Sequence, residues 1–193
     1  VALKNGMTLA KELDLIREIR KFSDIPLIGM GYINNMYHYG FEKFVEDFKA
    51  AGMDGVIIPD VPHEESGDLR RIAAAHDFVL AEFITPGTTA VRMEEICQDA
   101  SGFIYCVSNN GVTGVKKVDY STIGAVCDTA RSYTRTPLAV GFGIGSPESA
   151  VAAAAHADAV IVGSAVVKEL LAGKLDEAAQ LIADMREALD KSY

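Results

Sequence analysis

Two glycine-rich stretches near the end of the chain have residue types that could bind phosphate. Residues 141–144 read Gly-Phe-Gly-Ile and residues 163–165 read Gly-Ser-Ala, and each follows an apolar run. Glycine lets the backbone approach a ligand closely and turn N–H groups toward it. A Gly-Ser pair that opens a helix adds a hydroxyl and the positive end of the helix dipole. Tight turning between strand and helix is the alternative, but the two loops together favour a phosphate site.

Three further features could contribute chemistry. Asp60 lies in Pro-Asp-Val-Pro, where its carboxylate could act as a general acid or base or could hold loops together by accepting backbone N–H bonds. The flanking prolines fix the local backbone, which favours the second, structural role. Tyr105 lies in an apolar run, where it either packs or donates its hydroxyl to a ligand. Residues 108–114, followed by Lys116 and Lys117, form either a mobile lid or an ordinary surface loop.

Short, continuously apolar runs predict the strands that position these residues. The runs are Ile25–Gly31, Gly55–Ile58, Phe78–Ile84, Gly102–Val107, Pro137–Val140 and Ala157–Val162. Segments of helical period lie between them, and the tail Leu175–Leu189 reads as a long amphipathic helix with Leu181, Ile182, Met185 and Leu189 on one side. Thr8 and Ser146 suit helix N-caps, Pro147 a first turn, and Gly52 a C-cap.

Repeated βα units require right-handed crossovers and a parallel sheet covered by helices. No Gly-x-Gly-x-x-Gly follows the first strand and no Walker lysine is present, which favours a (β/α)8 TIM barrel over a doubly wound sheet. Six βα units are visible. The 193 residues are fewer than the roughly 250 typical of this barrel, so we expect residues 1–193 to form a single partial TIM-barrel domain.

Composition excludes several classes of protein. The net charge of −9 and the lack of a basic stripe argue against nucleic-acid binding. No apolar run is long enough for a membrane span, and no secretory signal is visible in a chain that begins at Val1. The three cysteines and four histidines show no ligand spacing, so neither a disulfide nor a metal is expected, and the cytoplasm is the expected location.

The loops, in this order, resemble those of the tryptophan synthase alpha chain family. The resemblance rests on residues 59–66, 105–114, 141–144 and 161–167, of which Ser-x-x-Gly-Val-Thr-Gly with Gly-Phe-Gly-Ile is the most specific part. It covers nearly all of the chain and aligns it with barrel strands three to eight. It implies a lyase of tryptophan biosynthesis that cleaves indole-3-glycerol phosphate to indole and glyceraldehyde 3-phosphate. Such a lyase needs no cofactor of its own and passes indole to a pyridoxal-phosphate beta chain in an alpha2beta2 complex.

The resemblance also implies roles for individual residues. Tyr105 would stand near the catalytic carboxylate, and Thr113 would belong to the lid. Met30 and Ile57 would form part of the wall facing the indole. The phosphate site would be lined by Gly114, Gly143, Gly163 and Ser164, with Phe142 beside them.

The family's two catalytic carboxylates, a glutamate and an aspartate, align before Val1. Residues 1–24 contain nothing like the strand and loop that carry them, so we expect the chain to be N-terminally incomplete and inactive by itself. Other hypotheses are a different phosphosugar barrel enzyme of histidine or tryptophan biosynthesis and a non-catalytic remnant that binds a beta chain. Six strands would leave two free sheet edges, which another segment, another chain or self-association would have to cover.

Overall fold

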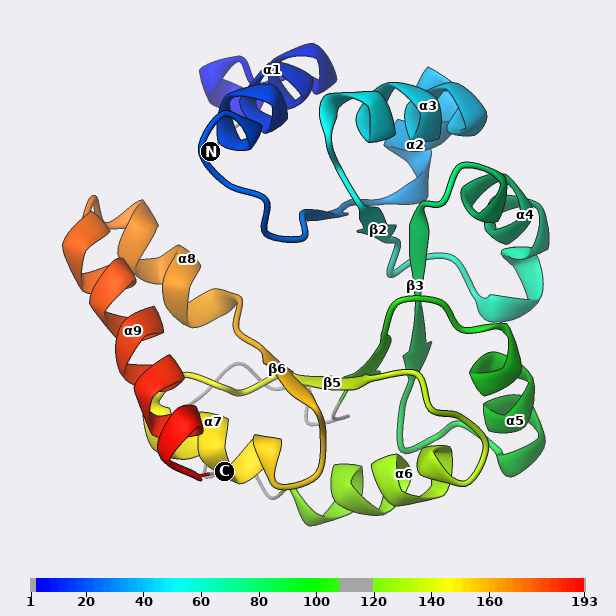
Figure 1. Ribbon diagram of the computed structural model, residues 1–193, viewed down its shortest axis with the longest axis vertical. Helices are drawn as coiled ribbons and strands as arrows, with labels where there is room; N and C mark the ends of the chain where they lie inside the picture. Colours follow the sequence, from blue (N-terminus) through cyan, green and yellow to red (C-terminus); the bar gives the residue numbers. More distant parts are fainter. Residues whose placement is uncertain (1–2, 108–119, 193) are drawn as a thin grey trace. The chain divides into compact units, whose positions relative to one another are not determined.

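A parallel sheet covered by helices is the framework of the protein, seen in a computed structural model that describes residues 3–107 and 120–192 (Figure 1). The described strands are β1 (Ile28–Met30), β2 (Gly55–Ile57), β3 (Val79–Ile84), β4 (Ile104–Val107), β5 (Leu138–Gly141) and β6 (Ala159–Ile161). They pair in sequence order, and every pair is parallel.

Helices follow the strands in a regular alternation, as βα crossovers require. The described α-helices are α1 (Leu9–Arg20), α2 (Ile33–Tyr39), α3 (Phe41–Ala51), α4 (Gly67–Ala75), α5 (Ala90–Asp99), α6 (Ser121–Arg131), α7 (Pro147–Ala154), α8 (Ser164–Leu171) and α9 (Leu175–Ser192). Short 3-10 turns, η1 (Leu3–Asn5) and η2 (His63–Glu65), precede α1 and α4. The chain divides into two compact units between Ala81 and Glu82, within β3.

In the first unit, α3 supplies the aromatic part of the core. Phe44 and Phe48 lie one helical turn apart and stack with ring centroids 4.2 Å apart. They share one buried cluster with Val56 of β2 and Leu80 of β3. The expected C-cap at Gly52 is confirmed: its φ of 108° lies in the left-handed region that glycine adopts without strain.

In the second unit, small side chains let helices approach closely. Ala150 and Ala153 of α7 are fully buried, and α7 packs against α9, whose Met185 lies in the same core cluster (Figure 1). The expected caps of α7 are confirmed. Ser146 accepts the N–H of Ser149, the Ser149 hydroxyl accepts the N–H of Ser146, and Pro147 is the first helical residue.

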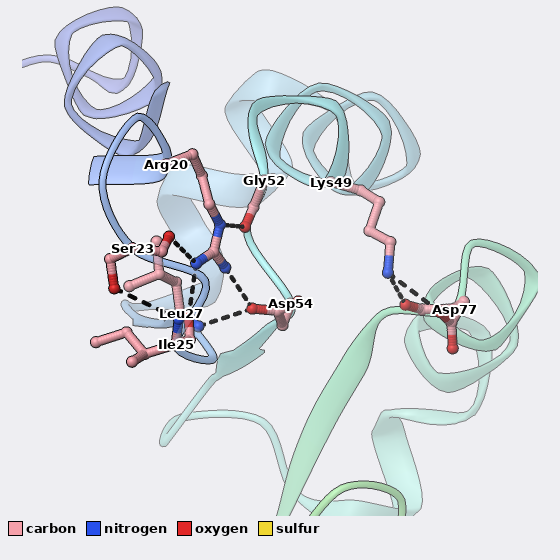
Figure 2. A network of polar contacts seen from close by, with 8 residues as sticks. All are labelled: Arg20, Ser23, Ile25, Leu27, Lys49, Gly52, Asp54 and Asp77. Atoms are coloured by element: carbon pink, nitrogen blue, oxygen red, sulfur yellow. Dashed lines mark hydrogen bonds and ion pairs between the residues drawn. The ribbon is translucent and has the colours of Figure 1, made fainter. Parts of the chain in front are cut away.

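A charged clamp holds the starts of β1 and β2 together in the first unit (Figure 2). Arg20, the last residue of α1, donates to the carboxylate of Asp54 (2.6 Å), and the same carboxylate oxygen accepts the N–H of Leu27 (2.8 Å). In return the Asp54 N–H donates to the Leu27 carbonyl (2.8 Å). Arg20 also donates to three carbonyl oxygens, those of Gly52 (2.8 Å), Ser23 (3.1 Å) and Ile25 (2.5 Å).

The second unit contains the same clamp at the starts of β5 and β6. Arg131, the last residue of α6, pairs with Asp158, whose carboxylate accepts the N–H of Leu138 (2.7 Å). The Asp158 N–H donates back to the Leu138 carbonyl (2.9 Å). In both units the residue after the leucine pairs with the residue after the aspartate: Ile28 with Gly55, and Ala139 with Ala159. The two strand pairs therefore have the same register.

Several sequence-based expectations were wrong in detail. The first and last strands are shorter than their apolar runs, and β6 is half-exposed rather than buried on both faces. Residues 33–39 form α2, a helix that was not expected from the sequence. Ile182, expected on the apolar side of α9, is 53% exposed, whereas Met185 is buried as expected.

Candidate ligand-binding loops

The loop that follows β5 has an unusual backbone. Phe142 has a φ of 100° and Gly143 a φ of 73°. Glycine adopts this left-handed region freely, but for phenylalanine it costs about 1–3 kcal/mol. The Phe142 side chain is 51% exposed, so burial of its ring does not offset that cost. Strain of this kind is typical of loops shaped for a ligand.

Tyr105 of β4 lies across the last residue of β5. A Cβ placed on Gly141 would overlap the Tyr105 ring and its hydroxyl, so only glycine leaves room for the ring there. The ring stacks on Phe83 with centroids 5.3 Å apart, and the side chain is buried. Burial raises the pKa of the Tyr105 hydroxyl above its ordinary value of 10.0, so this group, like any tyrosine hydroxyl at neutral pH, is a protonated hydrogen-bond donor. The sequence identified Tyr105 and placed Gly141 in the phosphate loop, but it did not indicate that Gly141 makes room for the Tyr105 ring, although a glycine ending a strand signals a close approach.

The loop after β6 lies beside the loop after β5 because Gly141 and Ile161 are paired in the sheet. Gly163 and Ser164 are both exposed, and Ser164 is the first residue of α8. Gly163 makes no side-chain cap bond to α8, and a Cβ added to it would meet nothing within 4 Å in the described part of the chain. By contrast, the start of α7 is already capped by its own serines. Among the described residues, the first turn of α8 therefore has no side-chain cap from its N-cap residue.

The residues expected at the indole wall lie in the first unit. Met30 and Ile57 are direct partners in the β1–β2 register, so the structure brings them together. Met30 is 65% exposed, and Ile57 is buried. Asp60 has the structural contact expected of it: its carboxylate accepts the N–H of Ile33 at 3.0 Å.

Some candidate residues fall outside what the structure describes. Thr113, Gly114 and the rest of the expected lid at 108–114, with Lys116 and Lys117, lie within residues 108–119. Within 3–107 and 120–192, no three His, Cys, Asp or Glu side chains gather where they could hold a metal ion. Over the same residues, no helix combines the length and apolar character of a membrane span.

Comparison with known proteins places these loops in a family. The family profile described as "Tryptophan synthase alpha chain" matches residues 1–192. The tryptophan synthase alpha chain of Desulfatibacillum aliphaticivorans is 44% identical over 164 residues, covering 85% of this chain and 62% of the relative. That of Caldanaerobacter subterraneus is 37% identical, covering 97% of this chain and 73% of the relative. The chain therefore spans 62% of the length of the first relative and 73% of the second.

Solved structures of the same family also resemble this chain. A structure from Aquifex aeolicus has a TM-score of 0.90 at 34% identity and covers 98% of this chain, which spans 72% of it. A tryptophan synthase alpha chain from Legionella pneumophila has a TM-score of 0.86, also at 34% identity, with the same coverage of both chains. A structure of the tryptophan synthase complex from Pyrococcus furiosus matches with a TM-score of 0.85 at 27% identity, covering 96% of this chain and 76% of that one. The predicted (β/α)8-barrel class, with six βα units, is confirmed.

Proposed function

The chain belongs to the tryptophan synthase alpha chain family, and on that premise we propose that it binds indole-3-glycerol phosphate, the substrate that the resemblance implies. The loops after β5 and β6 would hold the phosphate through the backbone N–H groups of Gly143 and Gly163 and the hydroxyl of Ser164. Phe142 would lie beside them, and Gly114 and Thr113 would complete the site. Met30 and Ile57 would face the indole.

One observation carries this proposal. In the second unit, two neighbouring strand ends present exposed glycines, and within residues 82–107 and 120–192 the start of α8 lacks the side-chain cap that the start of α7 has. A helix start with unpaired N–H groups and a positive dipole end favours an anion. The strained backbone at Phe142 on the adjacent loop supports the same use.

Calorimetric titration with inorganic phosphate tests the proposal. We expect Ser164→Ala to weaken phosphate binding about tenfold, because a hydrogen bond to a charged group is lost. Ser101→Ala, an exposed serine of the same unit, is the matched control and should leave the affinity unchanged. Equal affinities for the two variants would refute the assignment of this loop.

A second pair of variants tests whether the phosphate approaches the backbone at Gly163. A Cβ on Gly163 is free of contacts in the described residues, so Gly163→Ala should fold normally but narrow the space for a phosphate. Gly67→Ala, where the added Cβ likewise meets nothing, is its control. Weaker phosphate binding in Gly163→Ala alone, at unchanged thermal stability, is the expected result.

We also propose that the acid–base carboxylates of the reaction are not among residues 1–193. The first described residues form η1 and α1, and β1 begins only at Ile28, so residues 3–27 contain no strand followed by a loop. Cleaving the C–C bond requires a proton donor at the indole ring and a base for the glycerol hydroxyl. Tyr105 would assist only as a donor. We expect no measurable indole release from indole-3-glycerol phosphate; turnover would refute this placement.

The partner that the family implies is a beta chain, which would hold the pyridoxal phosphate. A structure of the tryptophan synthase complex from another organism resembles this chain, which supports the proposal. Self-association is a further proposal, because among the described residues β1 pairs with β2 alone and β6 with β5 alone, so no described strand pairs with the other edge of either. Co-elution with a beta chain, against the chain alone, tests the first of these.

A further inference from the structure

The repeated clamp assigns each loop of the first unit a counterpart in the second. Because Leu27 corresponds to Leu138 and Asp54 to Asp158, and the strand registers agree, residues further along can be matched by counting. Beyond β1 and β5, Ile33 corresponds to Ile144. Beyond β2 and β6, Asp60 corresponds to Ser164. The first unit therefore has a carboxylate at the position where the second has the hydroxyl proposed to bind phosphate.

The Asp60 carboxylate accepts a backbone N–H at the start of a helix, which is the kind of donor that a bound phosphate would use. It accepts the N–H of Ile33, the first residue of α2, at 3.0 Å across 27 residues of sequence. This bond joins the loop after β2 to the turn after β1. That turn begins directly after Met30, whose main chain in β1 lies beside Ile57. The hydrogen bond of Asp60 thus connects the ends of β1 and β2, the strands that contain Met30 and Ile57 of the proposed indole wall.

We propose that Asp60 is a positioning residue for the indole ring. By holding the Ile33 N–H it sets the turn that leaves β1 and with it the position of Met30. The same carboxylate supplies negative charge at this strand end, which favours an uncharged ring over a phosphate beside β1 and β2. The inference rests on the proposed function, because it assumes that Met30 and Ile57 contact indole.

Indole and inorganic phosphate, used as separate probes on the full chain, test this inference. The chain has no tryptophan, so fluorescence of added indole is measured against tyrosine alone. We expect Asp60→Ala to weaken indole binding about fivefold, the equivalent of one ordinary hydrogen bond, while phosphate affinity stays within about twofold. Asp60→Asn keeps an acceptor oxygen and should restore most of the indole affinity. Asp24→Ala, an exposed carboxylate of the same unit, should change neither.

The inference would be overturned if Asp60→Ala bound indole as tightly as the unsubstituted chain, or if it lost indole and phosphate affinity equally. Absence of indole binding by the unsubstituted chain, with phosphate binding intact, would also overturn it and leave the phosphate proposal standing. Hydrogen exchange at the Ile33 amide is a second measurement. Exchange of the Ile33 amide should be faster in Asp60→Ala than in Asp60→Asn. This difference is expected whether or not the chain binds phosphate, so it separates a failure of the inference from a failure of the proposed function.

Discussion

Replacing Arg20 by methionine should destabilise the first unit far more than the same change one turn earlier in α1. Arg20 donates to three carbonyl groups and to Asp54, and its side chain is only 19% exposed. Methionine keeps the apolar stem beside Gly52 but makes none of these bonds. Hydrogen bonds of a charged group contribute about 1.5–3 kcal/mol each when buried, and partial exposure of Asp54 (44%) reduces that contribution. We therefore expect a loss of about 3 kcal/mol.

Two matched variants provide reference values for the loss in the free energy of unfolding. Arg17 pairs with Asp14 on the surface, where the two side chains are 55% and 74% exposed, so Arg17→Met should cost under about 0.5 kcal/mol. Arg131 pairs with Asp158 at 37% and 44% exposure, so Arg131→Met should cost about 1 kcal/mol. Urea unfolding gives the three free energies. The N–H of Leu27 donates to the Asp54 carboxylate, so hydrogen exchange at this amide reports whether the contacts of Arg20 and Asp54 are intact.

The order of the three losses is the test of the reasoning. Arg20→Met should exceed Arg131→Met, which should exceed Arg17→Met. If Arg20→Met cost no more than Arg17→Met and left exchange at Leu27 unchanged, the clamp would contribute nothing to stability. The argument from the number of bonds would then be wrong.

Three further outcomes are expected. Gly141→Ala forces the Tyr105 ring to move and should cost about 1–3 kcal/mol in urea unfolding, whereas Gly67→Ala should cost nothing; equal effects would contradict the close approach. Burial opposes ionisation of Asp158, but the Leu138 N–H and Arg131 outweigh it and lower the pKa of Asp158 below its ordinary value of 3.8. Its stabilising effect is therefore complete above pH 3.8 and lost as the pH falls through the folded pKa, a dependence that unfolding of Asp158→Asn across that range should lack. Light scattering should show association that grows with concentration, and a monomer at all concentrations would contradict pairing at the free sheet edges.

Much of the fold was predictable because local chemistry and tertiary structure agree. Thr8, Ser146 and Gly52 cap helices where their side chains or backbone freedom suit them. The apolar runs predicted every described strand, although Ile25 lies outside β1 and is 63% exposed. Apolar character indicates which residues can be buried, whereas strand ends depend on pairing with a neighbour.

Helix α2 shows where local signals fail. Asn34, Asn35 and Gly40 are typical of turns, and Met36 is the buried residue of this helix. An Asp60 oxygen bonded to the first helical N–H supports the helix, and that bond comes from another part of the chain. The clamp was visible in part, since Pro-Leu follows Arg20 and Arg131 at the same spacing, but the aspartates that complete it lie 27 and 20 residues beyond the leucines.

The candidate site was predictable in type rather than in geometry. Glycine and serine at 163 and 164 indicate a phosphate loop from sequence alone. The left-handed backbone of Phe142 and the position of the Tyr105 ring over Gly141 depend on packing between strands, which no local pattern encodes.

The sharing of β3 between the two units decides how the chain can be divided for a split-protein reporter. A cut between Ala81 and Glu82 would leave two half-strands, one paired with β2 and the other with β4. A cut in the turn at 85–89 keeps β3 whole and leaves β4 with an unpaired edge that only its original neighbour matches in register. Fragments cut at that turn should therefore recover each other, and the turn is the place to open the chain when a signal must depend on reassembly.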